Sequence, residues 1–354
     1  MTRRSAKSHP DGKPDIRTVA SLARVSIATV SRTINGSTAV SEKLSKRVWQ
    51  AIEQLNYFPN THARSLVSGR SRILGIVVEN ITNPFFPELI ASFEEVAVAH
   101  GYEVLVSSGK IESAAQIERI VRRMLERKVE GVAVLTFGSE ESVLDQLAMH
   151  GIPLVLAEFV VDNPLVSTIE IDYATGIREA VEHLVGLGHR RIAYLAGPHT
   201  LHSAETRLHC FESSVVACGL RARREWVVDA DHTLRGGVTG MQKLLALEEK
   251  PTAVVCSNDM TAIGVLHAAH QAKMSVPEEL SVIGLDDIAF TEFTLPPLTT
   301  IGLSRHALAR TAFEALQQQA EPTETHADKR ISTVSTKLVV RESTAPPSTR
   351  SGRN

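Results

Sequence analysis

The chain is poor in cysteine and in aromatic residues, and it contains no long apolar run. Its three cysteines form no CxxC pair, and an odd number of unpaired thiols fits a reducing compartment. No segment approaches the roughly 18 consecutive apolar residues that a membrane-spanning helix needs. The basic N-terminus is not followed by the apolar stretch of a secretory signal. Together these features predict a cytoplasmic protein.

Motifs of catalysis and of metal binding are equally scarce. The sequence contains no nucleophile elbow, no phosphate-binding loop and no paired acid and base, and Gly236 and Gly237 lack the Lys-Thr of a P-loop. His199 and His202 lie three residues apart, with no Cys or carboxylate at metal-ligand spacing beside them. We therefore expect no enzyme activity, no metal site and no cofactor.

Charge is divided unevenly along the chain. Residues 1–72 contain 13 Lys and Arg against 4 Asp and Glu, a net charge of +9, whereas residues 73–354 have a net charge of −11. A basic head on an acidic body indicates that the head, and not the body, binds a polyanion such as nucleic acid.

The basic head contains the pattern of a helix-turn-helix. Residues 16–23 and 27–35 predict two short helices around a tight turn, and the Ser26 side chain can cap the second helix. The second helix of such a unit lies in the major groove of DNA. A generic helical hairpin of small residues would show a similar pattern, but the basic charge of the head favours DNA binding.

A third helix completes the head. Residues 42–56 follow Ser41, a suitable N-cap, and place apolar side chains at helical spacing. The predicted DNA-binding domain therefore spans residues 15–59. Residues 1–14 before it are polar and basic and are expected to form a disordered arm.

The second helix of the head offers base-reading side chains. Arg32 can donate two hydrogen bonds to a guanine edge, and Ile27 and Ala28 can contact a thymine methyl group. Thr29 and Ser31 suit phosphate contacts, which position the helix without reading sequence. The candidate DNA-binding residues of this helix are Ile27, Ala28, Thr29, Ser31, Arg32 and Asn35.

From residue 73 onward, short β-branched runs alternate with amphipathic helices, which is typical of parallel α/β sheets. The runs form two series, so we predict an α/β core of two doubly wound lobes over residues 73–343. A closed eight-stranded barrel is the alternative arrangement of such units. The tail, residues 344–354, is rich in Pro, Ser and Arg and is expected to be disordered. The predicted strands are residues 73–78, 102–106, 131–135, 153–157, 191–197, 226–228, 252–257 and 280–285.

Several motifs in one order resemble the lactose-repressor/galactose-repressor (LacI/GalR) family. The resemblance covers residues 16–343 and implies a core similar to periplasmic sugar-binding proteins. It further implies a homodimeric transcriptional regulator, a repressor, whose heads bind a pseudo-palindromic DNA operator under the control of a small effector. The motifs are the run from Thr18 to Val78, NPFF at 83–86, GHRRIAYLAGP at 188–198, SND at 257–259, VIGLDD at 282–287, PPLTTI at 296–301 and VVREST at 339–344.

The polar, basic segment 60–72 resembles the hinge helix of that family. A short polar helix is marginal alone in water, so we expect it to order when two copies pack together on DNA. Arg64 and Leu66 are its candidate DNA-binding residues. The resemblance makes Leu66 the wedge that enters the minor groove and kinks the duplex. The alternative for Leu66 is an ordinary linker leucine that packs on the head.

One position departs from the family pattern. The family usually has glycine in the turn, in the order Ala-Gly-Val-Ser, where this chain has Arg24. The turn tends to need a positive φ, which costs a non-glycine residue roughly 1 kcal/mol. We expect Arg24 to accept this strain and to lower the stability of the head.

Two parallel-sheet lobes place a cleft between the carboxyl ends of their strands, where open α/β sheets bind ligands. The resemblance assigns effector-binding roles to residues that follow the predicted strands. Arg, Asp and Asn groups there can grip hydroxyl groups, and an aromatic face can stack on a sugar ring or a base. The candidate effector-binding residues are Asn83, Phe85, Phe86, Ser203, Arg207, His232, Asn258 and Asp286.

Structural alternatives exist for several residues around this cleft. An Asp after a strand is often a helix N-cap, as Asp259 can be, and Asp287 can be structural. Phe86 can belong to the core, and Arg207 can pair with Asp286.

The nature of the effector is indicated by one position. Purine-binding relatives have an aromatic residue near His232, and the imidazole here argues against a purine, so a sugar or sugar derivative is favoured. The rival interpretation of the whole chain is a solute-binding receptor module whose head is vestigial. Specific DNA binding with a steep salt dependence would separate the two.

Overall fold

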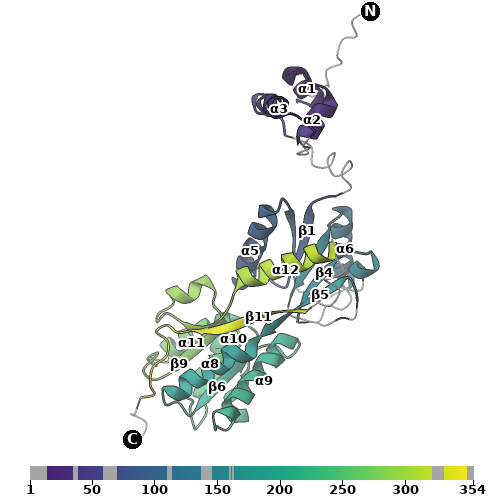
Figure 1. The fold of residues 1–354 in the computed structure, drawn as a ribbon. Coiled ribbons are helices and arrows are strands. Elements are labelled where there is room, and N and C mark those ends of the chain that lie inside the picture. Colours follow the sequence, from purple (N-terminus) through teal and green to yellow (C-terminus); the bar gives the residue numbers. More distant parts are fainter. Residues whose placement is uncertain are drawn as a thin grey trace, which may run out of the picture. The chain divides into compact units, whose positions relative to one another are not determined.

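The computed structural model describes residues 14–34, 39–58, 70–109, 114–136, 146–158, 161, 163–320 and 331–348. The chain divides into two compact units, Met1–Ser71 and Arg72–Asn354, which are described one at a time. Figure 1 traces the elements in chain order. The predictions for Asn35, Arg64 and Leu66 lie outside the described residues, as do most of the predicted arm and hinge.

The described residues of the first unit fold into three helices, α1 (Ile16–Ala23), α2 (Ile27–Ile34) and α3 (Glu42–Gln54). Asp15 starts α1 because its carboxylate accepts a hydrogen bond from the Thr18 backbone N–H at 2.8 Å. Fully buried Val19, Val30 and Val48, one from each helix, form the centre of a small apolar core. The unit is therefore held by packing between three short amphipathic helices.

Two details of the predicted head differ from the structure. Helix α3 ends at Gln54 rather than Asn56, because Asn56 adopts a φ of 48° that cannot continue a helix. Ser41 has the extended backbone of an N-cap, but its side chain makes no capping hydrogen bond. The predicted cap of α2 is confirmed, since the Ser26 Oγ accepts from the Thr29 backbone N–H at 3.1 Å.

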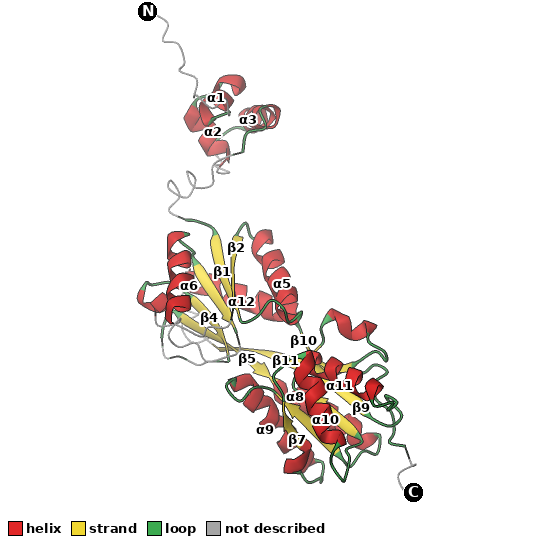
Figure 2. Cartoon of the chain, turned by 180° about the vertical axis from the view of Figure 1, so that it is seen from behind, coloured by secondary structure: helices red, strands yellow, loops and turns green. Residues whose placement is uncertain are grey.

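The second unit contains two α/β lobes, as predicted, and Figure 2 shows helices packed around the strands of each. The strands of lobe one are β1 (Ile73–Val78), β2 (Glu103–Ser108), β3 (Gly131–Leu135), β4 (Leu154–Ala157) and β5 (Val166–Asp172). Those of lobe two are β6 (Ile192–Ala196), β7 (Val227–Asp229), β8 (Ala253–Cys256), β9 (Ser281–Asp286) and β10 (Thr299–Leu303). The strand orders are β2-β1-β3-β4-β5 and β10-β9-β8-β6-β7, with parallel neighbours throughout.

Amphipathic helices cover these sheets. Lobe one carries α5 (Phe85–Ala99), α6 (Ala114–Glu126) and α12 (Arg305–Ala320). Lobe two carries α8 (Tyr173–Gly186), α9 (His202–Ala217), α10 (Leu234–Leu245) and α11 (Asp259–Gln271), with the short helices η1 (Arg224–Trp226) and η2 (Ala289–Phe293). Because α12 follows β10 of lobe two but packs along α5, the chain crosses between the lobes at this point.

One strand belongs to both lobes. The first half of β11 (Ile331–Val339) pairs in parallel with β5, and the second half pairs antiparallel with β10. The strands therefore form one continuous open array, which rules out the closed barrel. The sequence pattern does not predict β5, β10 or β11, because Ser, Thr, Glu or Gly residues interrupt their apolar runs.

The predicted disorder of the tail is wrong for its first residues. The Thr344 hydroxyl lies 3.0 Å from the His183 Nε2, and the Ala345 carbonyl lies 2.9 Å from the His189 Nε2. The Ala345 backbone N–H also donates to the Ser281 Oγ at 3.1 Å. Composition cannot show such partners, because they come from distant segments of lobe two.

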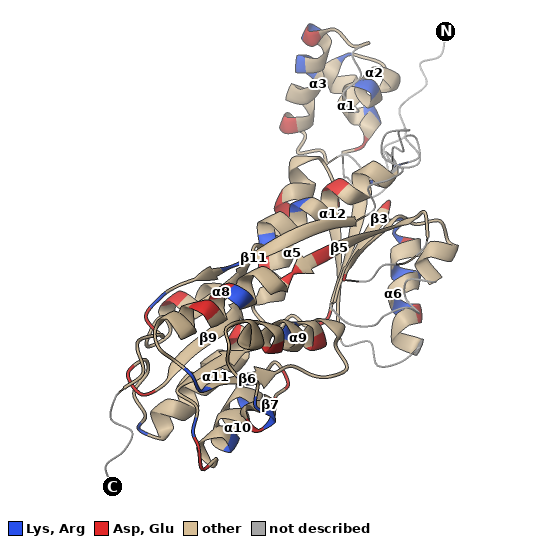
Figure 3. Cartoon of the chain, turned by 60° about the horizontal axis from the view of Figure 1, so that its bottom comes forward, with Lys and Arg blue, Asp and Glu red and all other residues tan. Residues whose placement is uncertain are grey.

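Among the described residues, no helix combines the length and the apolar character that crossing a membrane requires. Figure 3 shows acidic and basic residues interspersed over the helices of the second unit.

Candidate functional site

The second helix of the head presents the predicted base-reading side chains to solvent. Ile27, Ala28 and Arg32 are exposed on α2, whereas Val30 is fully buried. Thr29 is half-buried, and its hydroxyl lies 2.9 Å from the Ser26 Oγ at the start of the helix. The exposed face of α2 is thus free to enter a groove while its opposite face holds the core.

The turn before α2 has the strained backbone that its sequence predicts. Arg24 has φ 51° and ψ 50°, in the left-handed region. Its carbonyl and that of Ala23 accept hydrogen bonds from the Arg47 guanidinium of α3, which satisfies carbonyls left open at the end of α1. Arg24 therefore adopts the left-handed backbone that the turn needs, and this conformation strains a residue that carries a Cβ.

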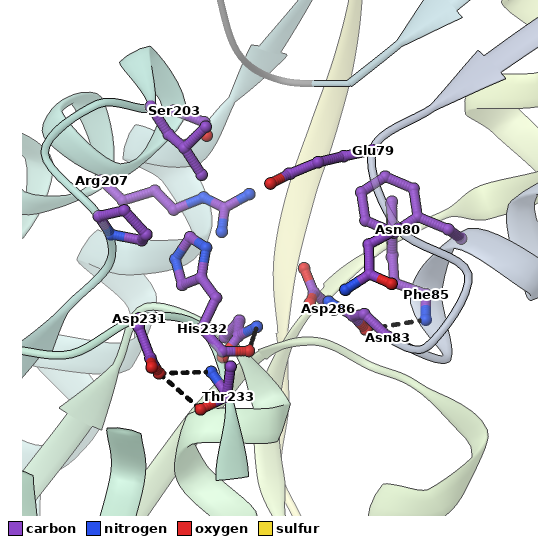
Figure 4. A pocket seen from close by; sticks show the side chains of 14 residues that line it. Glu79, Asn80, Asn83, Phe85, Ser203, Arg207, Asp231, His232, Thr233 and Asp286 are labelled. Carbon is purple, nitrogen blue, oxygen red and sulfur yellow. Dashed lines mark hydrogen bonds between the residues drawn. The ribbon is translucent and has the colours of Figure 1, made fainter. Parts of the chain in front are cut away.

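A cleft lies between the two lobes at the carboxyl ends of their strands. Figure 4 shows Glu79 and Asn83 of lobe one facing Arg207 and His232 of lobe two. The space measures about 690 Å³, counting the part open to solvent. All eight candidate effector-binding residues line it, namely Asn83, Phe85, Phe86, Ser203, Arg207, His232, Asn258 and Asp286.

Six further residues line the cleft that the sequence did not identify as candidates. They are Glu79, Asn80, Pro198, Leu201, Asp231 and Thr233. Most of them follow β1, β6 or β7 within four residues. Their position at strand ends was a signal that could have identified them.

Arg207 is buried at the base of the cleft and is held by two hydrogen bonds. One terminal nitrogen donates to the Ser257 carbonyl at 2.8 Å, and the other donates to the Tyr173 hydroxyl at 2.9 Å. Burial raises the pKa of Tyr173 well above its ordinary value, so the phenol stays neutral. The buried Nε of Arg207 has no hydrogen-bond partner among the described residues. Arg207 forms no ion pair with Asp286 among the described residues, contrary to the expectation, and its terminal nitrogens contact Ser257 and Tyr173 instead.

Asp286 is a buried acid on the wall that β9 provides. Its side chain is nearly inaccessible, and burial raises its pKa to about 8 against the opposing effect of the Arg207 charge. At neutral pH this carboxyl group is therefore largely protonated and can donate a hydrogen bond as well as accept one.

The two acids beside this wall have structural roles. Asp259 is fully buried, and its carboxylate accepts hydrogen bonds from the Ile288 backbone N–H at 2.9 Å and from the Thr300 hydroxyl at 2.5 Å. Asp259 is not the N-cap of α11, since Asn258 takes that position. Asp287 lies 2.7 Å from the Arg341 guanidinium, so it braces the C-terminal segment.

His232 and Asn258 form the rim of lobe two. The His232 Nε2 lies 2.9 Å from the Ser257 Oγ, and burial, assisted by the Arg207 charge, lowers the pKa of His232 to about 3. The Asn258 amide donates to the His232 carbonyl at 3.1 Å, while its oxygen caps α11. A side chain at Gly197 would place its Cβ 2.1 Å from the His232 ring, so only glycine allows this neutral imidazole to sit here.

The lobe-one wall is built from the start of α5. The Asn83 Oδ1 accepts from the Phe85 backbone N–H at 3.1 Å, which helps the helix begin. The Phe85 and Phe86 rings meet edge to face with centroids 5.5 Å apart, and both belong to the apolar core. Phe85 and Phe86 therefore pack in the core and also line the cleft. Among the described residues, no group of His, Cys, Asp and Glu is suited to hold a metal ion.

Comparisons with known proteins match both units. Residues 15–60 match the family described as bacterial regulatory proteins, lacI family, and residues 181–344 match the periplasmic binding protein-like domain. The chain is 31% identical to the HTH-type transcriptional repressor PurR of Photobacterium profundum, over 93% of this chain and 98% of the relative. It is 32% identical to the HTH-type transcriptional repressor CytR of Escherichia coli, over 93% and 96%.

Solved structures show the same likeness. The lac repressor dimer bound to operator and an anti-inducer matches with a TM-score of 0.82 and 27% identity, over 94% of this chain and 99% of that one. A complex of the transcriptional regulator CelR with cellobiose matches with a TM-score of 0.70 and 28% identity, over 94% of this chain and all of that one.

Proposed function

The chain belongs to the lacI family of bacterial regulatory proteins, and on that premise we propose that it is a dimeric transcriptional repressor. Its interlobe cleft binds a neutral, hydroxyl-rich effector, a sugar in preference to a purine. The observation that carries this proposal is the union in one chain of a helix-turn-helix head and a two-lobed cleft lined by Arg207, His232 and Asp286. The role is regulation and not catalysis, and its compartment is the cytoplasm, where the DNA of a bacterium lies.

Two copies of the exposed α2 face suit the two halves of a pseudo-palindromic operator. Arg32, Ile27 and Ala28 read bases, and Thr29 and Ser31 contact phosphates. The segment 60–72 forms the hinge between units, with Arg64 and Leu66 contacting DNA near the centre of the operator. Asn35, the next residue in the sequence after α2, adds a further DNA contact.

The charges around the cleft favour a neutral ligand. Arg207 is the only Lys or Arg among the described lining residues, whereas Glu79 and Asp231 supply two carboxylates, beside the largely protonated Asp286. A phosphate or carboxylate on the ligand would meet this excess of acid, and desolvated like charges repel strongly. Hydroxyl groups instead match carboxylate acceptors, the guanidinium donor and the protonated Asp286.

The lining of the cleft suits a ring compound. Phe85 and Phe86 offer apolar ring edges, and a neutral His232 offers an imidazole beside them. The likeness to the CelR complex with cellobiose supports a sugar.

Matched pairs of compounds test the effector class. We would measure the melting temperature of the full chain with glucose, cellobiose and ribose, with their phosphorylated or carboxylated counterparts, and with nucleosides and nucleobases. A ligand at 100 times its Kd adds about 2.7 kcal/mol to the stability of the unit that binds it. We expect a rise for a neutral sugar and none for its charged partner; a larger rise for the charged member would contradict the charge argument.

Gel shifts test the DNA-binding role. A specific operator fragment should bind with an affinity that falls steeply with salt, since each neutralised phosphate contributes about 0.9 to the logarithmic salt slope. Weak, sequence-blind binding would instead support a receptor module with a vestigial head.

A further inference from the structure

Glu88 of α5 lies at the junction of the two lobes. Its Oε1 accepts a hydrogen bond from the Ala289 backbone N–H at 3.0 Å, and its Oε2 lies 3.1 Å from the Arg305 Nε. A terminal nitrogen of Arg305 donates in turn to the Asp286 carbonyl at 2.6 Å. One carboxylate and one guanidinium thus join lobe one to the loop that follows β9 in lobe two.

The joined segments also carry the walls of the cleft. Phe85 and Phe86 precede Glu88 on α5 and line the lobe-one wall, while Asp286 precedes Ala289 and lines the lobe-two wall. The contact therefore spans the same gap that a ligand touching both walls would bridge.

The loop after β9 needs such support because its backbone is strained. Asp286 and Asp287 have φ values of 124° and 57°, in regions that residues other than glycine rarely adopt. Strain of this kind persists only where surrounding contacts over-determine the backbone. Beside the hydrogen bonds within the loop from Thr291 to the Ile288 carbonyl, Asp259 holds the Ile288 N–H and Glu88 holds the Ala289 N–H.

Arg305 occupies a crossing of the chain between the lobes. It is the first residue of α12, two residues after the end of β10, and α12 packs along α5. The Arg305 and Glu88 side chains are 20% and 27% exposed, so their attraction is screened less than that of an open surface pair.

We propose that Glu88 and Arg305 form an interlobe latch that fixes the separation of the cleft walls and places Asp286 opposite α5. Both are positioning residues, since they act through Asp286 and α5 and neither lines the cleft. Loosening the latch lowers the population of the arrangement in which both walls can meet one ligand, and affinity falls with that population. The latch is independent of the effector class proposed above.

Hydrogen–deuterium exchange of the full chain, without any added compound, tests the latch. Glu88→Gln keeps the length of the side chain but removes its charge, and Arg305→Gln removes the partner charge. We expect each variant to speed exchange at least fivefold in peptides covering residues 79–86 and 286–293. The double variant should match Arg305→Gln and fall short of the sum of the two single variants, because both substitutions remove the Glu88–Arg305 ion pair while Arg305→Gln also removes the hydrogen bond to the Asp286 carbonyl.

Two controls make the result specific. Glu95→Gln alters an exposed carboxylate on the same helix that makes no hydrogen bond or ion pair among the described residues, and should change nothing. Peptides covering the buried strand β8 should keep their exchange rate in every variant. If Glu88→Gln fails to fold, Glu88→Asp, which keeps the charge on a shorter side chain, should give a smaller rise in the same two segments.

Three results would overturn the proposal. They are unchanged exchange in both charge variants, faster exchange confined to the neighbours of Ala289 with residues 79–86 unaffected, and a uniform rise that includes β8. The last would mean that the pair only stabilises the fold.

Discussion

Replacing Arg24 by glycine is expected to stabilise the DNA-binding head. Arg24 holds a left-handed backbone, φ 51° and ψ 50°, between α1 and α2. Its side chain is exposed and makes no hydrogen bond or ion pair among the described residues, so its removal costs little. Glycine adopts this conformation without steric cost, and the relief of strain amounts to roughly 1 kcal/mol.

The expected shift in melting temperature is large because the head is small. An unfolding entropy of about 2.1 cal/mol/K per residue gives roughly 95 cal/mol/K for a domain of about 45 residues. A gain of ~1 kcal/mol then raises the melting temperature of the head by roughly 10 °C. The second unit should melt as before, since the substitution lies outside it.

Differential scanning calorimetry of the full chain measures the two transitions separately. Arg24→Ala is the matched control, because it removes the same charge and side chain but keeps the Cβ that causes the strain. We expect stabilisation in the glycine variant and none in the alanine variant. Equal stabilisation in both, or a lower melting temperature for glycine, would refute the assignment of strain to the backbone.

Three further predictions follow from the hinge and the cleft. Leu66→Ala should weaken specific operator binding in gel shifts while the melting temperature of the second unit stays unchanged; unaltered operator affinity would refute the wedge role. Arg207→Lys should weaken binding of the sugar found by the thermal screen at least tenfold in calorimetric titration, since lysine cannot donate to Ser257 and Tyr173 in the same fork geometry; wild-type affinity would speak against a ligand at this guanidinium. Asp286→Asn should gain stability relative to wild type as pH rises. The folded pKa of Asp286 is raised to about 8, so its contribution is present at low pH and is lost as pH rises from the unfolded value toward 8. Urea titrations at pH 5 and pH 7 should show a relative gain of up to about 1.4 kcal/mol per pH unit, and a pH-independent difference would contradict the raised pKa.

Local patterns predicted the head and the position of the cleft. Helices α1 and α2 begin at the predicted residues because Asp15 and Ser26 supply capping groups that depend only on near neighbours in sequence. The eight cleft candidates all line the cleft because parallel strands present their carboxyl ends at one edge.

Roles inside the cleft could not be predicted in the same way. The sequence allowed Arg207 to pair with Asp286, whereas the structure gives its nitrogens to Ser257 and Tyr173, which lie 50 and 34 residues away in sequence. Asn258, and not Asp259, caps α11. The Asp259 carboxyl group instead accepts hydrogen bonds from the Ile288 backbone N–H and the Thr300 hydroxyl, so it has other partners.

The sequence by itself determined the order of the head helices and of eight strands, the division into a basic head and an α/β body, and which residues follow those strands. These depend on periodicity, caps and charge, which act over a few residues. Only the tertiary structure decided that β11 joins both lobes, that Thr344 and Ala345 are anchored, and that Glu88 meets Arg305 across the lobes. Such contacts join segments far apart in the chain, and no local pattern encodes which distant partner will satisfy a buried polar group.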